Sequence, residues 1–180
     1  MNVLIYGHSQ SGGMGLDLVS ALKAAGHRVE RVTRIGYTDP KLLQEAPTST
    51  ADRVVLYAGG NTDKADPESI RKLVDHFGKE RTVVVLGPIN SDNPKADLWR
   101  ARNAGNVEGL KEYVRVYSVE ASGKEFWPDK LHMKPKAPSS VQLAKQIVAD
   151  LTGKAPPSDT PVLLYVGAGL LLFLLLRSRG

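Results

Sequence analysis

Residues 3–13 read Val-Leu-Ile-Tyr-Gly-His-Ser-Gln-Ser-Gly-Gly. An unbroken apolar run that ends in glycines is typical of a strand buried on both faces and closed by a tight turn. The residues that follow place Leu16, Val19 and Leu22 at helical spacing, and Gly26 supplies a helix stop. A strand, a turn and a helix in this order predict an α/β fold with a parallel sheet.

The same alternation continues along the chain. After the strand Asn2–Tyr6, further strands are expected at Arg28–Thr33, Arg53–Tyr57, Thr82–Leu86 and Tyr113–Val119. Helices are expected at 13–25, 66–77, 94–111 and 141–151, the last capped by Ser139 or Ser140. Charges interrupt the second strand, which suits an edge, whereas the fourth is fully apolar and suits the centre. We therefore expect a three-layer α/β/α sandwich with a five-stranded, mostly parallel sheet in the order 2-1-3-4-5.

Composition excludes several classes of site. The 180 residues include no cysteine, so disulfides and thiolate chemistry are absent. The four histidines lack metal-ligand spacing, and neither a metal nor a cofactor is expected. The net charge of +5 is spread along the chain and does not indicate a nucleic-acid partner.

Residues that are candidates for a catalytic or binding site follow four of the expected strands. Ser9 follows the first strand, Gly36 the second and Gly59-Gly60-Asn61 the third, while Asp129 and His132 lie after the fifth. The carboxyl ends of parallel strands meet at one edge of a sheet, which is where such sheets bind ligands. A serine, a histidine and a carboxylate at that edge are the set that nucleophilic catalysis requires.

Taken in chain order, these residues resemble those of the SGNH (GDSL-type) hydrolase family, a group of serine esterases with a flavodoxin-like fold. The resemblance covers residues 1–151 and rests on the ordered set, since no one motif is specific. It implies that Ser9 is the nucleophile, that His132 is the general base and that Asp129 orients the imidazole. It also implies an oxyanion hole made by the backbone amides of Ser9 and Gly36 and the side-chain amide of Asn61.

Each residue also has a structural explanation when taken alone. Ser9 would cap the first helix, Gly36 and Asn61 would serve turns, and His132 would be a loop residue. The chain departs from the family at His8, where an aspartate is usual; the change adds a titratable imidazole beside the serine and leaves open a domain that binds without catalysis. An α/β-hydrolase elbow is disfavoured because the serine follows the first strand and the acid lies three residues from the histidine. A dinucleotide-binding loop is disfavoured because the glycine spacing does not match.

Two further groups of residues lie close to the expected site. Phe126, Trp127 and Pro128 precede Asp129 and are candidates to line an acyl or leaving-group pocket, or simply to pack the long loop. Asn90, Asp92 and Asn93 follow the fourth strand and would either contact substrate or form turns.

The end of the chain differs from the rest. Val162–Leu176 carries no charge and is followed by Arg177 and Arg179. At about 1.5 Å per residue it covers about 23 Å of a hydrocarbon core of about 30 Å, so flanking residues and snorkelling arginines would complete a span. We expect a hydrolase-like domain at 1–152, a linker at 153–160 and a single-pass membrane anchor at 161–177. The alternative for the apolar segment is a buried core helix, and the side of the membrane is left open.

These expectations combine into one functional hypothesis. The chain is predicted to be a membrane-anchored serine esterase or deacylase that hydrolyses O-acyl esters, such as O-acetyl glycans or lipid esters, through an acyl-serine intermediate. The lipid bilayer and the acyl ester are its expected partners, and the oligomeric state is left open. The alternative is a catalytically inactive domain of the same fold, serving as a membrane-anchored structural or binding component; a membrane-containing virion is one setting that would fit.

Overall fold

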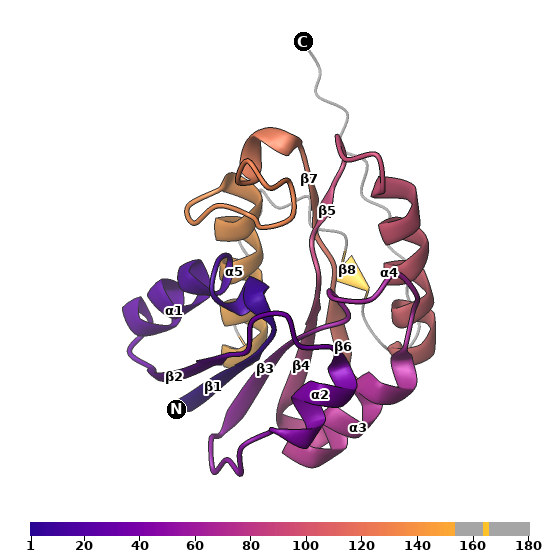
Figure 1. Cartoon of the computed structure of the whole chain (residues 1–180). Helices are drawn as coiled ribbons and strands as arrows, with labels where there is room; N and C mark the ends of the chain where they lie inside the picture. Colours follow the sequence, from indigo (N-terminus) through magenta and orange to yellow (C-terminus); the bar gives the residue numbers. More distant parts are fainter. Residues whose placement is uncertain (154–163, 166–180) are drawn as a thin grey trace.

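A computed structural model of the chain describes residues 1–153 and 164–165 (Figure 1). The strands are β1 (Asn2–Gly7), β2 (Arg28–Thr33), β3 (Arg53–Ala58), β4 (Thr82–Leu86), β5 (Ile89–Asn90), β6 (Arg115–Tyr117), β7 (Glu120–Ala121) and β8 (Leu164–Tyr165). The α-helices are α1 (Gly15–Ala24), α2 (Asp39–Gln44), α3 (Pro67–Phe77), α4 (Ala96–Leu110) and α5 (Pro138–Thr152). Strands and helices alternate as the sequence predicts.

The main sheet has the order β2-β1-β3-β4-β6-β8. The first five of these strands are parallel, and β8 pairs antiparallel with β6. Because β6 is the fifth strand expected from the sequence, the predicted order 2-1-3-4-5 is confirmed. The charged strand β2 lies at an edge and the apolar strand β4 lies in the interior, because a strand without a charged face needs cover on both sides.

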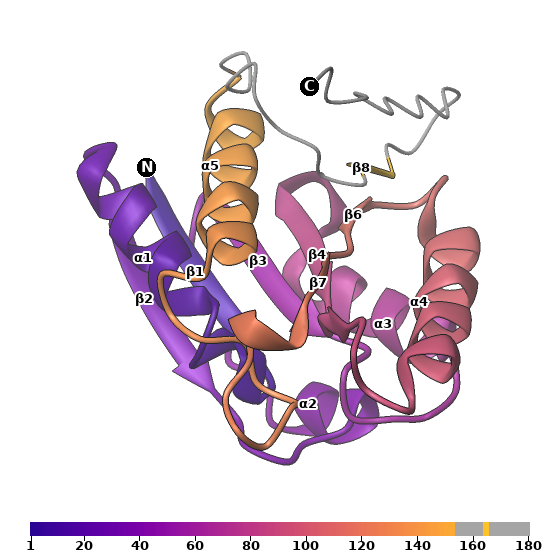
Figure 2. The ribbon, with the colours of Figure 1, turned by 90° about the horizontal axis from the view of Figure 1, so that it is seen from above.

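Helices cover both faces of the sheet. α1 and α5 lie on one face and α2, α3 and α4 on the other (Figures 1 and 2). Successive side chains of a strand point to opposite faces, so in β1 Val3 and Ile5 pack against one helical layer while Leu4 and Tyr6 pack against the other. This division explains why the central strands carry runs of consecutive apolar residues rather than alternate ones.

Several local features differ from the prediction. The fifth strand is shorter than the expected Tyr113–Val119, and α2, β5 and β7 were not expected. A helix of six residues or a strand of two is too short to show a periodic pattern, so sequence spacing could not reveal them. β5 and β7 pair with each other beyond the carboxyl ends of β4 and β6.

The predicted serine cap of the last helix is wrong. α5 begins at Pro138, and Ala137 is its N-cap. Ser139 lies inside the first turn, where its backbone N–H and its hydroxyl both donate to the Glu125 carboxylate. An acid from the preceding loop thus satisfies a free N–H at this helix start in place of a capping side chain.

The expected membrane segment lies outside the described residues, apart from Leu164 and Tyr165. The backbone of these two residues forms strand β8. Within residues 1–153 and 164–165, no helix combines the length and the apolar character that crossing a bilayer requires. The linker expected at 153–160 is described only at Gly153, whose left-handed backbone (φ +68°) ends α5.

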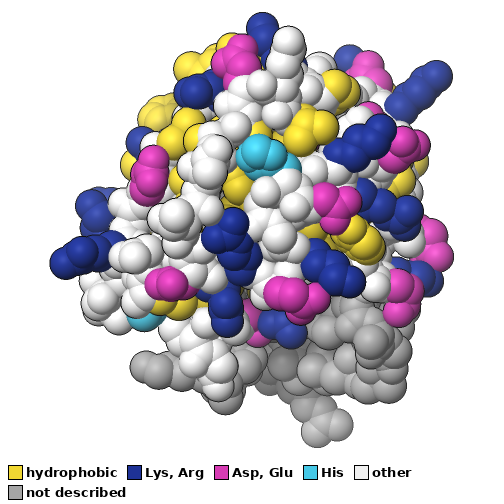
Figure 3. Space-filling model, turned by 90° about the horizontal axis from the view of Figure 1, so that it is seen from below, with side chains coloured by type: hydrophobic (Ala, Val, Ile, Leu, Met, Phe, Trp, Pro, Cys, Tyr) yellow, Lys and Arg dark blue, Asp and Glu magenta, His cyan; other side chains and the backbone are white. Residues whose placement is uncertain are grey.

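The charged side chains are mixed on the surface. On the face seen from below, Lys and Arg side chains are interspersed with Asp and Glu (Figure 3). The 24 basic and 19 acidic side chains of the sequence give the formal charge of +5, and this face shows no separate patch of either sign.

Candidate active site

Three side chains from two segments far apart in the sequence meet at the carboxyl end of the sheet. The Ser9 Oγ lies 2.8 Å from His132 Nε2, and His132 Nδ1 lies 2.8 Å from Asp129 Oδ2. A serine hydroxyl on one imidazole nitrogen and a carboxylate on the other is the geometry in which a base can activate a nucleophile. Ser9 is partly buried, while the His132 and Asp129 side chains remain 36% and 45% exposed, so the group is open to solvent.

The turn after β1 presents Ser9. Gly7 ends the strand with φ +150°, and a Cβ at this position would lie 2.1 Å from the Tyr57 carbonyl oxygen. Only glycine permits this approach, which lets the His8 N–H donate to the same carbonyl at 3.2 Å. Ser9 then begins a 3₁₀ turn (Ser9–Ser11) above the strand tip.

Main-chain and side-chain bonds fix the loop that carries Asp129 and His132. The Trp127 N–H donates to the His132 carbonyl at 2.8 Å and closes the loop on itself. The buried side chain of Asn90 donates to the Lys130 carbonyl at 3.2 Å. The Gln10 side chain donates to the Leu131 carbonyl at 2.7 Å, so the residue after Ser9 ties the turn of Ser9 to the loop of His132.

The Asp129 carboxylate is held in its ionised form. Desolvation acts to raise its pKa, but hydrogen bonds from the backbone and ring N–H groups of His132 and from the Leu131 N–H outweigh it and lower the pKa below its usual range. An ionised carboxylate at this position favours the imidazole tautomer with the proton on Nδ1. That tautomer leaves Nε2 free to accept the proton of Ser9.

The three expected oxyanion donors come to one hollow. Ser9, Gly36 and Asn61 all line a space of about 230 Å³ that also contacts His132. Within the described part of the chain, neither the Ser9 N–H nor the Gly36 N–H donates to another backbone carbonyl. One N–H of the Asn61 amide donates to the Tyr37 carbonyl at 2.8 Å, which fixes the side chain and leaves its second N–H available.

Two buried charged residues hold the loop that carries Asn61. The Gly59 N–H donates to both oxygens of Asp39, at 3.0 and 3.1 Å. Arg102 Nη1 donates to the carbonyl oxygens of Gly60 and Thr62, at 3.2 and 3.1 Å. Neither Asp39 nor Arg102 shows its role in the sequence, because each reaches the loop from a separate helix.

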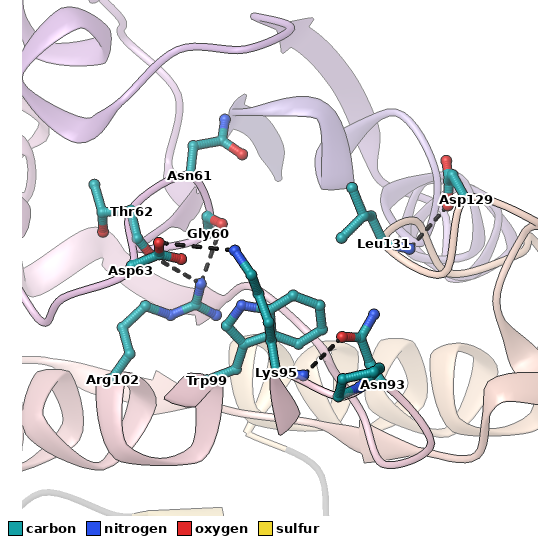
Figure 4. A pocket seen from close by; sticks show the side chains of 11 residues that line it. Gly60, Asn61, Thr62, Asp63, Asn93, Lys95, Trp99, Arg102, Asp129 and Leu131 are labelled. Carbon is teal, nitrogen blue, oxygen red and sulfur yellow. Dashed lines mark hydrogen bonds and ion pairs between the residues drawn. The ribbon is translucent and has the colours of Figure 1, made fainter. Parts of the chain in front are cut away.

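A larger hollow of about 570 Å³ adjoins the first (Figure 4). Gly60, Asn61 and Arg102 come from one side of it and Asp129 and Leu131 from the other. Trp99, Lys95 and Asp63 also line it, with Lys95 Nζ 3.9 Å from Asp63 Oδ2. Trp99 lines both hollows, and no sequence pattern distinguishes it from a core aromatic residue.

The other candidates near the site are mainly structural. Phe126 is buried in the core, and neither Trp127 nor Pro128 lines either of the two hollows. Asn90 braces the loop that carries Asp129 and His132, and Asp92 accepts from the Gly123 N–H at 2.8 Å. Asn93 is the member of this set that lines the larger hollow. Within residues 1–153 and 164–165, no group of three or more His, Asp or Glu side chains is placed to hold a metal ion.

The expectation that His8 would add an imidazole to the site is corrected. The side chain is fully buried beneath Gly60, where a Cβ would lie 2.5 Å from His8 Nε2, and it lines neither hollow. Burial lowers its pKa to about 4, so the ring is neutral at physiological pH. Nδ1 accepts from the Gln10 N–H at 3.4 Å, and Nε2 finds no partner in the described part of the chain.

His8 and Asp39 should give opposite pH dependences of stability. Burial raises the pKa of Asp39 to about 6 from 3.8, so the folded state keeps a proton that the unfolded state loses, and stability falls as pH rises from 4 to 6. The lowered pKa of His8 means that the unfolded state binds the extra proton, and stability rises over the same window. The two effects nearly cancel in the wild type.

Single substitutions should reveal each slope. As pH rises from 4 to 6, the free energy of unfolding of His8→Gln should fall relative to the wild type, because only the effect of Asp39 remains. That of Asp39→Asn should rise over the same range, because only the effect of His8 remains. Each change should be roughly 3 kcal/mol, at about 1.36 kcal/mol per pKa unit. Urea unfolding at half-unit pH steps measures both. Curves for the two variants that run parallel to the wild-type curve would contradict the assigned shifts.

Comparisons with known proteins give structural matches alone. No protein-family model matches the sequence, and no curated protein matches it either. One similar solved structure is a family two carbohydrate esterase from Clostridium thermocellum in complex with cellohexaose, at 12% identity and TM-score 0.56, covering 84% of this chain and 63% of that one. Another is a putative GDSL-like lipase from Bacteroides ovatus, at 14% identity and TM-score 0.59, covering 86% of this chain and 55% of that one.

A third match is similar in size to this chain. It is the C-terminal catalytic domain of peptidoglycan O-acetyltransferase A from Streptococcus pneumoniae with a methylsulfonyl adduct, at 16% identity and TM-score 0.56, covering 87% of this chain and 97% of that domain. This chain spans less than two thirds of the length of the first two proteins. The matches show that the protein has the α/β fold of SGNH (GDSL-type) esterases.

Proposed function

We propose that the protein is a serine esterase or deacylase that cleaves O-acyl esters through an acyl-enzyme on Ser9. The observation that carries the proposal is the continuous chain of 2.8 Å contacts from Ser9 Oγ through His132 to Asp129. A helix cap or a loop histidine would not require these three side chains to be aligned in this way. The shared fold with esterases supports the same conclusion.

The first half of the reaction forms the acyl-enzyme. Ser9 Oγ attacks the ester carbonyl carbon while its proton passes to His132 Nε2, and Asp129 stabilises the imidazolium that results. The carbonyl oxygen becomes an oxyanion that the Ser9 and Gly36 N–H groups and the Asn61 amide stabilise. The tetrahedral intermediate collapses, the bond to the alcohol oxygen breaks, and His132 returns the proton to the departing alcohol.

The second half repeats these roles with water. A water molecule gives a proton to His132 Nε2 as its oxygen attacks the acyl carbon, and the second tetrahedral intermediate expels Ser9 Oγ. The serine oxygen recovers the proton from His132, and the carboxylic acid leaves. The exposure of His132 and Asp129 is consistent with direct access of water to this step.

The substrate class and the cellular setting extend the proposal. Small O-acyl groups on glycans are favoured, because the fold is shared with a carbohydrate esterase and with a peptidoglycan O-acetyltransferase, and the hollow over Ser9 is small. Lipid esters are the alternative substrate. The uncharged segment Val162–Leu176 is proposed to anchor the domain to a membrane.

Asn61 should contribute as an oxyanion donor. Replacing Asn61 by alanine should lower kcat for a short-chain aryl ester by about 10²–10³-fold with a smaller change in KM, because the donor acts mainly in the transition state. Asn2→Ala, at the amino end of β1, is a matched control that should keep wild-type rates. An Asn61 variant as active as this control would exclude the side chain from the oxyanion hole.

A fluorophosphonate probe tests the proposed chemistry directly. The wild-type protein should be labelled covalently at Ser9, and a panel of acyl esters, thioesters and acetylated glycans should identify a hydrolysed substrate. Peptide mapping of the labelled protein locates the modified serine. A protein that is not labelled and cleaves none of the panel would instead support a binding or structural role.

A further inference from the structure

Arg102 is a buried cation that forms no ion pair with a carboxylate in the described part of the chain. Only 4% of its surface is exposed, although it lines both the hollow over Ser9 and the larger hollow beside it. Its Nη1 and Nε atoms donate to neutral oxygens, the carbonyls of Gly60 and Thr62 and the side chain of Asn103. Burying a guanidinium against neutral acceptors costs free energy unless an anion compensates its charge.

Burial lowers the pKa of Arg102, and Asp39 and Asp63 offset this in part through space, but both acids are engaged with other groups. Asp39 accepts two hydrogen bonds from the Gly59 N–H, and Asp63 lies 3.9 Å from Lys95 Nζ. Within the described residues, no carboxylate forms an ion pair with Arg102, and its Nη2 donates no hydrogen bond. Nη2 keeps some accessible surface, and Arg102 lines the hollow over Ser9.

We propose that Arg102 binds an anionic group, a carboxylate or a phosphate, on the alcohol part of the substrate. A guanidinium with a free N–H edge is suited to either oxyanion. The alcohol part is favoured because the larger hollow, about 570 Å³ against 230 Å³, carries the additional polar groups Asn93, Lys95 and Asp63. This inference rests on the proposed esterase function and adds the charge of its substrate.

Arg102 would have two roles, because it also holds the loop that carries Asn61. The same guanidinium that would meet the anion holds the Gly60 and Thr62 carbonyls on either side of Asn61. A purely structural role in this loop would affect all substrates equally. Recognition of an anion would raise kcat/KM for anionic substrates over neutral ones. The ratio of these two values therefore separates the two roles.

The test compares matched esters of similar shape. Kinetics of the wild type are measured with 4-acetoxybenzoate, with its neutral methyl ester and with 4-acetoxyphenyl phosphate. At least one anionic ester should have a kcat/KM about 10- to 100-fold above the neutral ester, as a charge-assisted hydrogen bond of this kind provides. The two anionic arms distinguish a carboxylate substrate from a phosphate substrate. Equal values for all three esters would overturn the proposal without any variant.

Variants assign the preference to Arg102. Arg102→Gln should remove it and Arg102→Lys should retain part of it, whereas Lys72→Gln, which makes the same charge change on α3, should leave it intact. A preference that persists in Arg102→Gln would overturn the assignment. Calorimetric titration of Ser9→Ala with the same esters measures binding without turnover. Selective binding of an anionic ester by a protein that cleaves none would leave the anion site standing while the esterase proposal fails.

Discussion

Ser9→Ala should lower the kcat/KM for a short-chain aryl ester by about 10⁴- to 10⁶-fold and abolish fluorophosphonate labelling. Alanine removes the oxygen that forms the covalent bond, and no neighbouring group replaces it, because the hydroxyl of Ser11 is directed to the His8 carbonyl and to Thr33. The substitution removes one partly buried oxygen and should leave the fold intact.

Ser20→Ala is the matched control for this experiment. Ser20 lies exposed on α1, and its hydroxyl bonds to the Leu16 carbonyl within the same helix. It should keep full activity and labelling. If Ser9→Ala retained either property, the nucleophile would have to lie elsewhere, and the proposed mechanism would be wrong.

His132→Ala should lower the same rate by about 10⁴-fold or more, and Asp129→Asn by about 10³- to 10⁴-fold. Alanine removes the base that takes the proton from Ser9. Asparagine keeps the size of Asp129 but removes the negative charge that fixes the tautomer of His132 through the 2.8 Å contact to Nδ1. Steady-state kinetics on one aryl ester measures both losses.

The combined variants provide a stricter test. Because Ser9, His132 and Asp129 act as one unit, the double variant Ser9→Ala/His132→Ala should be no slower than the slower of the two single variants. Multiplication of the two losses would show that the residues act independently. The exposed His76 of α3 is the matched control for loss of an imidazole, and His76→Ala should retain activity.

The order of the main sheet could be predicted because it depends on local and repeated features. Apolar runs such as Val83-Val84-Val85 need cover on both faces, and the helices between the strands supply it only if the strands are parallel. The charged strand β2 could then lie only at an edge. The short elements α2, β5 and β7 carry no such pattern, and contacts with the rest of the fold determine them.

Some residues of the candidate site could also be predicted from the sequence, and others could not. Residue type and position after a strand were enough to propose Ser9, Gly36, Asn61, Asp129 and His132, and the fold brings them together because a parallel sheet places its strand ends at one edge. Gln10, Asn90 and Asp39, which brace the loops that carry them, have no distinguishing sequence pattern. Their hydrogen bonds join segments up to 121 residues apart, and no local spacing encodes such a contact.

His8 and Arg102 show most clearly what the sequence cannot determine. From the sequence, His8 was a second imidazole beside the serine, and Arg102 was one cation among 24 basic residues. The fold buries His8 beneath Gly60 as a neutral ring and places Arg102, also buried, against the hollow over Ser9. Residue type and spacing were sufficient to predict the sheet and to propose which polar residues meet at its edge. The burial and charge state of each polar side chain depend on the packing around it, which exists only once the chain has folded.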